Sequence, residues 1–97
     1  MTYILVRWLH NFADEPILLY SELDGDRYET RKVEIFRDGR LGLAGPGVES
    51  GGSVLGTEPT PPIGEIAASP EFVPQEVTPD EFEAVWRIAL QVTSTAA

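Results

Sequence analysis

The residues best suited to chemistry in this chain gather in the stretch WLHNFADEPILLYSEL, residues 8–23. It holds the chain's one histidine, His10, two residues after Trp8 and shortly before the acidic pair Asp14 and Glu15. A histidine that is oriented by a carboxylate can act as a general base toward a serine or a water molecule. The stretch therefore has two interpretations, a catalytic or metal site and the corner between two strands.

The pattern favours the corner. Trp8 and His10 end an alternating strand, so their side chains point to the same face as the apolar side chains before them. Pro16 suits the first position of the next strand, where proline is tolerated. Zinc takes three or four ligands, and one histidine in a chain without cysteine supplies too few. We expect His10 to satisfy a loop carbonyl beside Trp8, and we expect no metal site and no cofactor.

Residues 2–45 are typical of an antiparallel meander of about four strands. Four runs are rich in β-branched, aromatic and other apolar residues: YILVRWL, PILLYSEL, RYETRKVEIF and RLGLAG. Asp24-Gly25 and Asp38-Gly39 separate the last three runs, and Asp-Gly favours the tight two-residue turns of hairpins. Such a turn at Asp38-Gly39 predicts two cross-strand pairs, Ile35 with Gly42 and Val33 with Ala44.

Residues 46–77 differ in composition, with most of the chain's prolines and a glycine-rich stretch, GPGVESGGSVLG. The glycines lack the Lys-Ser/Thr pair that completes a phosphate-binding loop. Apolar residues recur too often for a disordered linker: Val48, Val54, Leu55, Ile63, Ile66, Phe72 and Val73. We predict an ordered, irregular connection that lies on the sheet, with a short helical turn near Ile63–Ala68.

Residues 78–92 predict an amphipathic helix. Thr78 and Glu81 form a capping box at its start, where the threonine hydroxyl accepts from a first-turn amide. Four apolar residues then recur at i, i+3, i+4 and i+7: Phe82, Val85, Trp86 and Ala89. We expect this face to pack on the sheet, broadened by Ile88 and Leu90.

Together these elements predict a single α+β domain over residues 1–97. An antiparallel meander over 2–45 is followed by the irregular connection over 46–77 and by the helix over 78–92, which covers one face. Residues 93–97 are expected to fray. The first residues lack the pattern of a signal peptide, and no apolar run reaches the length that spans a bilayer. We therefore expect a cytoplasmic protein.

Charge is the strongest feature of the composition. Sixteen acids against seven bases give a net charge of −9. Residues 1–45 hold eight acids and six bases, whereas residues 46–97 hold eight acids and one base. Such a field repels nucleic acid and anionic membranes, and it attracts a basic protein. Acidity can also serve solubility alone, so the charge leaves both interpretations open.

Two hypotheses about function follow. The first is a non-catalytic acidic binding protein, such as an immunity or antitoxin-type inhibitor of a basic protein partner. Its candidate partner-binding residues are exposed acids of the second half: Glu58, Glu65, Glu71 and Glu76. The second is a small enzyme or ligand-binding domain whose pocket lies near four residues of the first half: Trp8, His10, Glu15 and Tyr20.

Four blocks of the sequence also carry a resemblance: WLHNFADEPILLYSEL, RKVEIFRDGRLG, ESGGSVLGTEP and TPDEFEAVW. In order and spacing they are similar to a family of small bacterial single-domain proteins of unknown function. The resemblance extends from about Tyr3 to Trp86. It implies a single bacterial domain that is encoded alone, and it assigns no catalytic residues.

Overall fold

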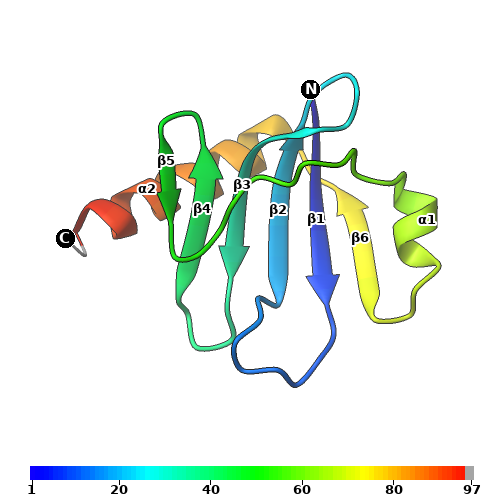
Figure 1. The fold of residues 1–97 in the computed structure, drawn as a ribbon, viewed down its shortest axis with the longest axis horizontal. Coiled ribbons are helices and arrows are strands. Elements are labelled where there is room, and N and C mark those ends of the chain that lie inside the picture. The colour runs from blue at the N-terminus through cyan, green and yellow to red at the C-terminus, as the bar shows by residue number, and fades with distance from the viewer. Residues whose placement is uncertain (96–97) are drawn as a thin grey trace.

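The computed structural model describes residues 1–95. Among them, six strands form one sheet (Figure 1): β1 (Thr2–Trp8), β2 (Leu18–Leu23), β3 (Glu29–Ile35), β4 (Leu41–Gly45), β5 (Val48–Ser50) and β6 (Phe72–Glu76). Two helices accompany the sheet in this part of the chain: α1 (Ile63–Ala67) and α2 (Pro79–Thr95). The strand order is β5-β4-β3-β2-β1-β6, and all neighbouring strands are antiparallel. The predicted α+β class is confirmed, with six described strands in place of about four.

Two of these strands come from the stretch that was expected to be irregular. β5 continues the meander because Gly47, at φ +75°, lets the chain reverse after β4. β6 returns the chain to the far edge of the sheet, where Pro74 lies opposite Val6 of β1. Proline cannot donate to a strand ladder, and an edge strand tolerates it because one side of its backbone needs no partner strand.

The hairpin between β3 and β4 differs from the predicted register by one residue. Phe36 N donates to Arg40 O at 2.9 Å, so three residues form the loop, with Gly39 at φ +92°. Ile35 consequently lies opposite Leu41, and Val33 lies opposite Leu43. The observed register puts Leu43 on the same face as Val33, where both are fully buried. The predicted pairing would have turned Leu43 away from this core.

The turn between β2 and β3 is also longer than a two-residue hairpin. Asp24 Oδ1 accepts from the backbone N–H groups of Asp26 at 2.9 Å and Tyr28 at 3.0 Å. The left-handed position falls on Arg27, at φ +66°, and not on Gly25. An Asp side chain that holds its own turn explains why this loop needs no tight glycine turn.

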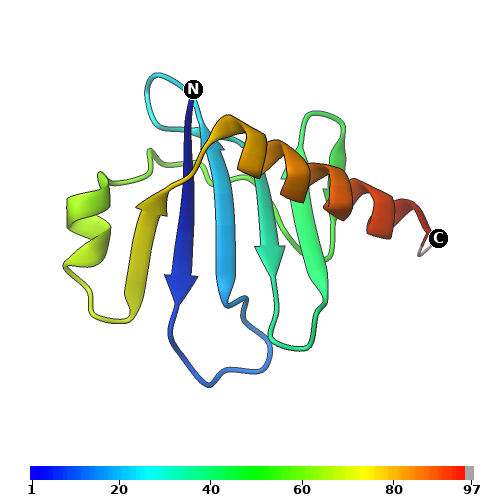
Figure 2. The ribbon, with the colours of Figure 1, turned by 180° about the vertical axis from the view of Figure 1, so that it is seen from behind.

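α2 lies diagonally across one face of the sheet (Figure 2). Its fully buried Ala89 packs with Val33 and Leu43, and its fully buried Phe82 contacts the Tyr3 ring, with centroids 5.3 Å apart. Ile88 and Leu90 are 56% and 37% exposed, so the prediction that they broaden the buried face is wrong. A flat sheet covers only one stripe of a helix, and these two side chains lie beyond that stripe.

The start of α2 agrees with the prediction, whereas its end does not. Thr78 Oγ1 accepts from Glu81 N at 3.1 Å, as a capping threonine does. The helix continues to Thr95, three residues beyond the predicted end at residue 92. Of the tail that was expected to fray, residues 93–95 are helical, and residues 96–97 lie outside the described residues.

Residues 51–62, called the crossing segment below, pass over the face of the sheet opposite α2 (Figure 1). Three bonds tie their backbone to β3 and to the turn before it: Lys32 Nζ to Val54 O (3.1 Å), Gly56 N to Glu29 Oε1 (2.6 Å) and Thr60 N to Arg27 O (2.8 Å). α1 then begins within the predicted helical turn and lies beside β6. The connection is therefore ordered and lies on the sheet, as predicted.

Candidate functional site

A pocket of about 490 Å³ lies on the face of the sheet opposite α2, between β1, β2, β6, the crossing segment and α1. We call it the open-face pocket. Its floor is apolar and comes from the strands: Ile4, Val6, Trp8, Leu19 and Phe72. Its walls are mixed and come from the crossing segment and from the stretch around α1: Thr60, Pro61, Glu65, Ile66 and Ser69. Ser21 and Glu29 complete the lining.

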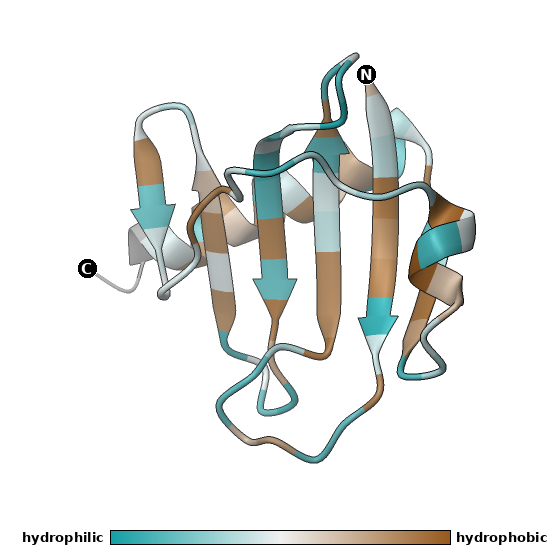
Figure 3. Ribbon diagram, turned by 45° about the vertical axis from the view of Figure 1, so that its right-hand side comes forward, coloured by the Kyte–Doolittle hydropathy of each residue, from teal (hydrophilic) through white to brown (hydrophobic). Residues whose placement is uncertain are grey.

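Strand alternation assembles this floor. Ile4, Val6 and Trp8 are two residues apart on β1, so they share one face. Leu19 lies opposite Val6 on β2, and Phe72 lies opposite Trp8 on β6. Figure 3 shows the apolar residues running along the middle of β1 and recurring in α1. Ile4 is almost fully buried, whereas the other four floor residues are half-buried.

Arg27 fixes the crossing segment at one side of the pocket. Its Nε donates to Thr60 O at 2.8 Å, and its Nη2 donates to Pro61 O at 2.9 Å. On the α1 side, Phe72 N donates to Ser69 O at 3.0 Å and ties the end of the helical turn to β6. The walls are thus held by bonds at both ends, with the pocket between them.

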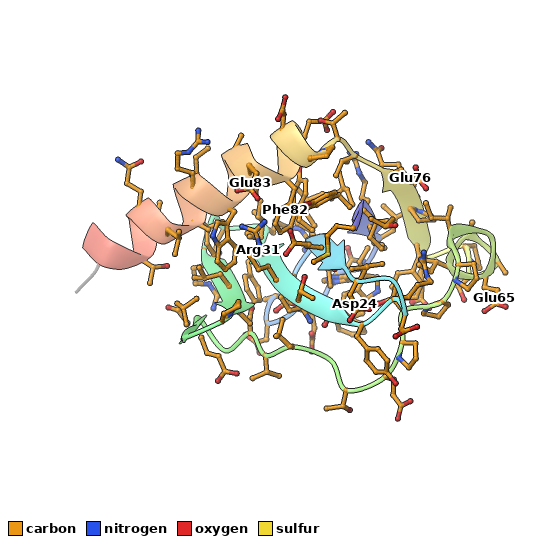
Figure 4. The ribbon with its side chains drawn as sticks, turned by 90° about the horizontal axis from the view of Figure 1, so that it is seen from above. Asp24, Arg31, Glu65, Glu76, Phe82 and Glu83 are labelled. Atoms are coloured by element: carbon orange, nitrogen blue, oxygen red, sulfur yellow. The ribbon has the colours of Figure 1, made fainter. Side chains whose placement is uncertain are left out.

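The charge that lines the pocket is negative. Of the described residues that line it, two are acids and none is a base. The negative charge of Glu29 is compensated by its partners. Its carboxylate accepts from Lys32 Nζ at 3.1 Å, from Gly56 N at 2.6 Å and from Ser21 Oγ at 3.3 Å. Glu65 is exposed on α1 at the rim (Figure 4). The carboxylate of Glu65 is therefore the negative charge that the pocket presents at its solvent-exposed rim.

His10 occupies the corner after β1. Its Nδ1 accepts from Phe12 N at 2.9 Å, which leaves the ring proton on Nε2, and Nε2 donates to Pro16 O at 2.8 Å. The ring also contacts Trp8 edge-on, with centroids 4.3 Å apart. Both ring nitrogens are engaged with the backbone of the turn, so the geometry is that of a structural histidine.

The four residues of the alternative pocket are not all brought together. Trp8 and His10 share a hollow of about 530 Å³ that Arg7 and Arg37 also line. Glu15 instead lines a smaller hollow of about 370 Å³, together with Trp8. Tyr20 lies on the α2 face, where it packs against the cluster of Val33, Leu43 and Ala89. The indole N–H of Trp8 is buried and has no hydrogen-bond partner among the described residues.

The four candidate partner-binding acids are all exposed. Glu71 precedes the edge strand β6 and Glu76 is its last residue, Glu65 lies on α1 beside it, and Glu58 lies on the crossing segment. Glu65 and Glu76 lie toward the same side of the molecule in Figure 4. Three of the four therefore gather at the β6 edge of the sheet. Among the described residues, no group of three or more histidine, cysteine, aspartate or glutamate side chains could hold a metal ion.

Most of the basic residues are engaged within the protein. Five of the seven, all in the described part, bind carboxylates or backbone carbonyls: Arg27, Arg31, Lys32, Arg37 and Arg40. Arg37, for example, donates to the carbonyl of His10, and Arg40 Nε donates to Asp38 Oδ2 at 2.8 Å. Their carboxylate partners are Glu22, Glu29, Asp38 and Glu83, so none of these ion pairs involves an acid at the β6 edge.

One polar cluster was missed by the sequence analysis. Arg31 forms two bonds to Glu22, Nε to Oε1 at 2.8 Å and Nη2 to Oε2 at 2.6 Å, and it also pairs with Glu83 of α2 (Figure 4). Its guanidinium lies 5.0 Å from the Phe82 ring centroid and 5.1 Å from that of Trp86. The bonds from Arg31 outweigh burial and lower the pKa of Glu22 to about 2. This cluster joins α2 to the sheet, so its role is structural.

The fold and the site define a small α+β protein with a helix on one face of its sheet and an open pocket on the other. The family model described as "Domain of unknown function (DUF6881)" matches residues 2–91, and the chain belongs to this family. The expectation of a small family of unknown function is thereby confirmed. No curated protein and no solved structure matches the chain. Within the described residues, no helix has the length and apolar character needed to span a membrane.

Proposed function

We propose that this protein is a non-catalytic binding protein whose acidic surface receives a basic protein partner, as an immunity or antitoxin-type inhibitor does. One observation carries the proposal. Five of the seven described basic side chains bind carboxylates or backbone carbonyls of the protein, while Glu58, Glu65, Glu71 and Glu76 are exposed and take part in none of these bonds. Three of these four acids, Glu65, Glu71 and Glu76, lie on or beside the edge strand β6 of a chain whose net charge is −9.

Long-range attraction is the physical basis of this function. A surface of one sign raises the local concentration of an oppositely charged partner and speeds the encounter, while it repels wrong partners. The same field opposes nucleic acid and anionic lipid surfaces, which favours a protein as the partner. We place this activity in the bacterial cytoplasm, supported by the resemblance of the four sequence blocks to bacterial proteins.

A non-catalytic role is supported by the state of His10. Its two nitrogens hold the turn between β1 and β2 through Phe12 N and Pro16 O. A general base needs a free nitrogen within hydrogen-bond reach of the proton that it removes. Activity by this residue would require the turn to open first.

An affinity capture from the native host tests the proposal. The bait is compared in two charge-reversed forms, each with four acids changed to lysine. One form changes the proposed surface: Glu58, Glu65, Glu71 and Glu76. The control form changes four exposed acids elsewhere: Asp14, Glu15, Asp26 and Glu49.

We expect the wild type and the control to retain one basic protein, identified by mass spectrometry, that the surface variant loses. The control matters because both variants change the net charge equally. Loss of the partner by both variants alike, or capture of no basic protein by the wild type, would contradict the proposal.

A further inference from the structure

We propose that the open-face pocket binds a small organic cation with a flat apolar body, the chemistry of an arylalkylamine. This inference concerns a small molecule on the face of the sheet opposite α2, and it goes beyond the protein partner proposed for the β6 edge. Its first basis is the size of the pocket. A volume of about 490 Å³ lies within the range of roughly 300–1,000 Å³ that is usual for small-molecule sites.

The second basis is an apolar floor that the fold leaves uncovered. Val6, Trp8, Leu19 and Phe72 remain half-buried beneath the gap between the crossing segment and α1. Covering apolar surface is favourable by about 25 cal/mol for each Å² removed from water. Two of these side chains, Trp8 and Phe72, are aromatic and lie side by side with ring centroids 5.9 Å apart, and aromatic rings pack favourably against another aromatic body.

The third basis is charge. No described residue that lines the pocket is basic, and Glu65 supplies an uncompensated carboxylate at the rim. A cation is also attracted by the faces of aromatic rings such as Trp8 and Phe72. The overall charge of −9 raises the local concentration of any small cation. An anion of the same shape would meet repulsion from each of these features.

The fourth basis is that the pocket exists before any ligand arrives. Arg27 holds the crossing segment through Thr60 O and Pro61 O, and Phe72 N holds the chain after α1 through Ser69 O. Binding to a formed pocket avoids the cost of ordering loops and side chains. A small ligand can therefore gain measurable affinity here from the contacts alone.

The test is a titration of the ¹⁵N-labelled wild-type protein with three probes that share an indole body. Tryptamine is a cation, tryptophol is neutral and indole-3-acetate is an anion. The reporter is the indole N–H resonance of Trp8, which a Trp86→Phe sample distinguishes from the second tryptophan. We expect saturable shifts with tryptamine, about tenfold weaker binding of tryptophol and weaker binding still of indole-3-acetate. Equal affinities for the three probes, or no saturable shift with tryptamine, would overturn the proposal.

Matched variants locate the binding. Val6→Phe fills the floor of the pocket, whereas Val73→Phe adds the same bulk at an exposed position of β6 on the opposite face. We expect the first to abolish tryptamine binding and the second to retain it. Glu65→Gln should weaken tryptamine about three- to fivefold and leave tryptophol unchanged. If Val6→Phe does not fold, Leu19→Phe replaces it, since Leu19 lies opposite Val6 on the same floor. Equal loss in the pocket variant and in Val73→Phe would contradict the assignment.

Discussion

At the scale of single residues, Arg31 is a polar side chain that joins three elements of the fold. It links β3 to Glu22 on β2 and to Glu83 on α2, and its guanidinium lies over the Phe82 and Trp86 rings. Glu22 is buried, so its charge is tolerated only because the guanidinium and the Thr30 hydroxyl satisfy it. The geometry thus makes protonation of Glu22 costly to the folded state.

The lowered pKa of Glu22 predicts how stability depends on pH. The folded state holds this pKa at about 2, against an ordinary value of 4.5, chiefly through the bonds from Arg31. The contribution is therefore complete above about pH 4.5, and it is lost as the pH falls from 4.5 toward 2. We expect at most about 3 kcal/mol of the free energy of unfolding to disappear in this window.

Two measurements check this prediction. An NMR titration of the Glu22 carboxyl carbon should have its midpoint near 2, and a midpoint near 4.5 would contradict the account. Urea unfolding at several pH values should show a shallower acid slope for Glu22→Gln than for the wild type. Glu65→Gln, a change at an exposed acid, is the matched control and should keep the wild-type slope.

At the scale of elements, the features that were predicted correctly are those that depend on residues close together in the sequence. The α2 stripe of Phe82, Trp86 and Ala89, and the cap at Thr78, depend on spacing along one helix, and the structure contains both. β6 was missed because Pro74 masks a strand whose partner, β1, is about seventy residues earlier in the chain. The register at Gly39 was missed because burial of Leu43 opposite Val33, a tertiary effect, decided between two turns.

The candidate site was predicted less well than the fold, because it too depends on contacts between residues that are distant in the sequence. Alternation on β1 placed Trp8 and His10 on one face, and their rings are in contact. Tyr20 was grouped with them, although alternation on β2 turns it toward α2. The open-face pocket arises where the crossing segment and α1 pass over the strands, which no local pattern encodes. Likewise, Arg31 and Glu83 are fifty-two residues apart.

Docking of α2 through its buried stripe predicts a contrast between two substitutions. Trp86→Ala should lower the free energy of unfolding by about 3 kcal/mol, because it removes an indole that packs on Gly45, on Arg31 and on the core. Ile88→Ala is the control on the exposed side of the same helix, and it should cost no more than about 0.5 kcal/mol. Chemical denaturation measures both. Equal effects would show that the helix does not dock through Trp86.

At the scale of the whole molecule, the two faces and the β6 edge of the sheet carry different structural features. One face carries α2 and most of the core, the opposite face carries the crossing segment and the open-face pocket, and the β6 edge carries Glu65, Glu71 and Glu76. The ion pairs of the described residues use Glu22, Glu29, Asp38 and Glu83, and none of them involves an acid of this edge. The proposed partner therefore meets an acidic edge whose strand, β6, is paired with β1.

The most direct test of the proposed function is the association rate of the captured partner, measured by stopped-flow at low and high salt. Exposed charges act mainly on the encounter, and salt screens them within about 8–10 Å at physiological ionic strength. We expect association to slow steeply with salt while dissociation changes little. Changing Glu58, Glu65, Glu71 and Glu76 to lysine should lower the association rate about tenfold or more. A rate that is indifferent to both salt and charge reversal would contradict the account and leave the acidity as a means of solubility.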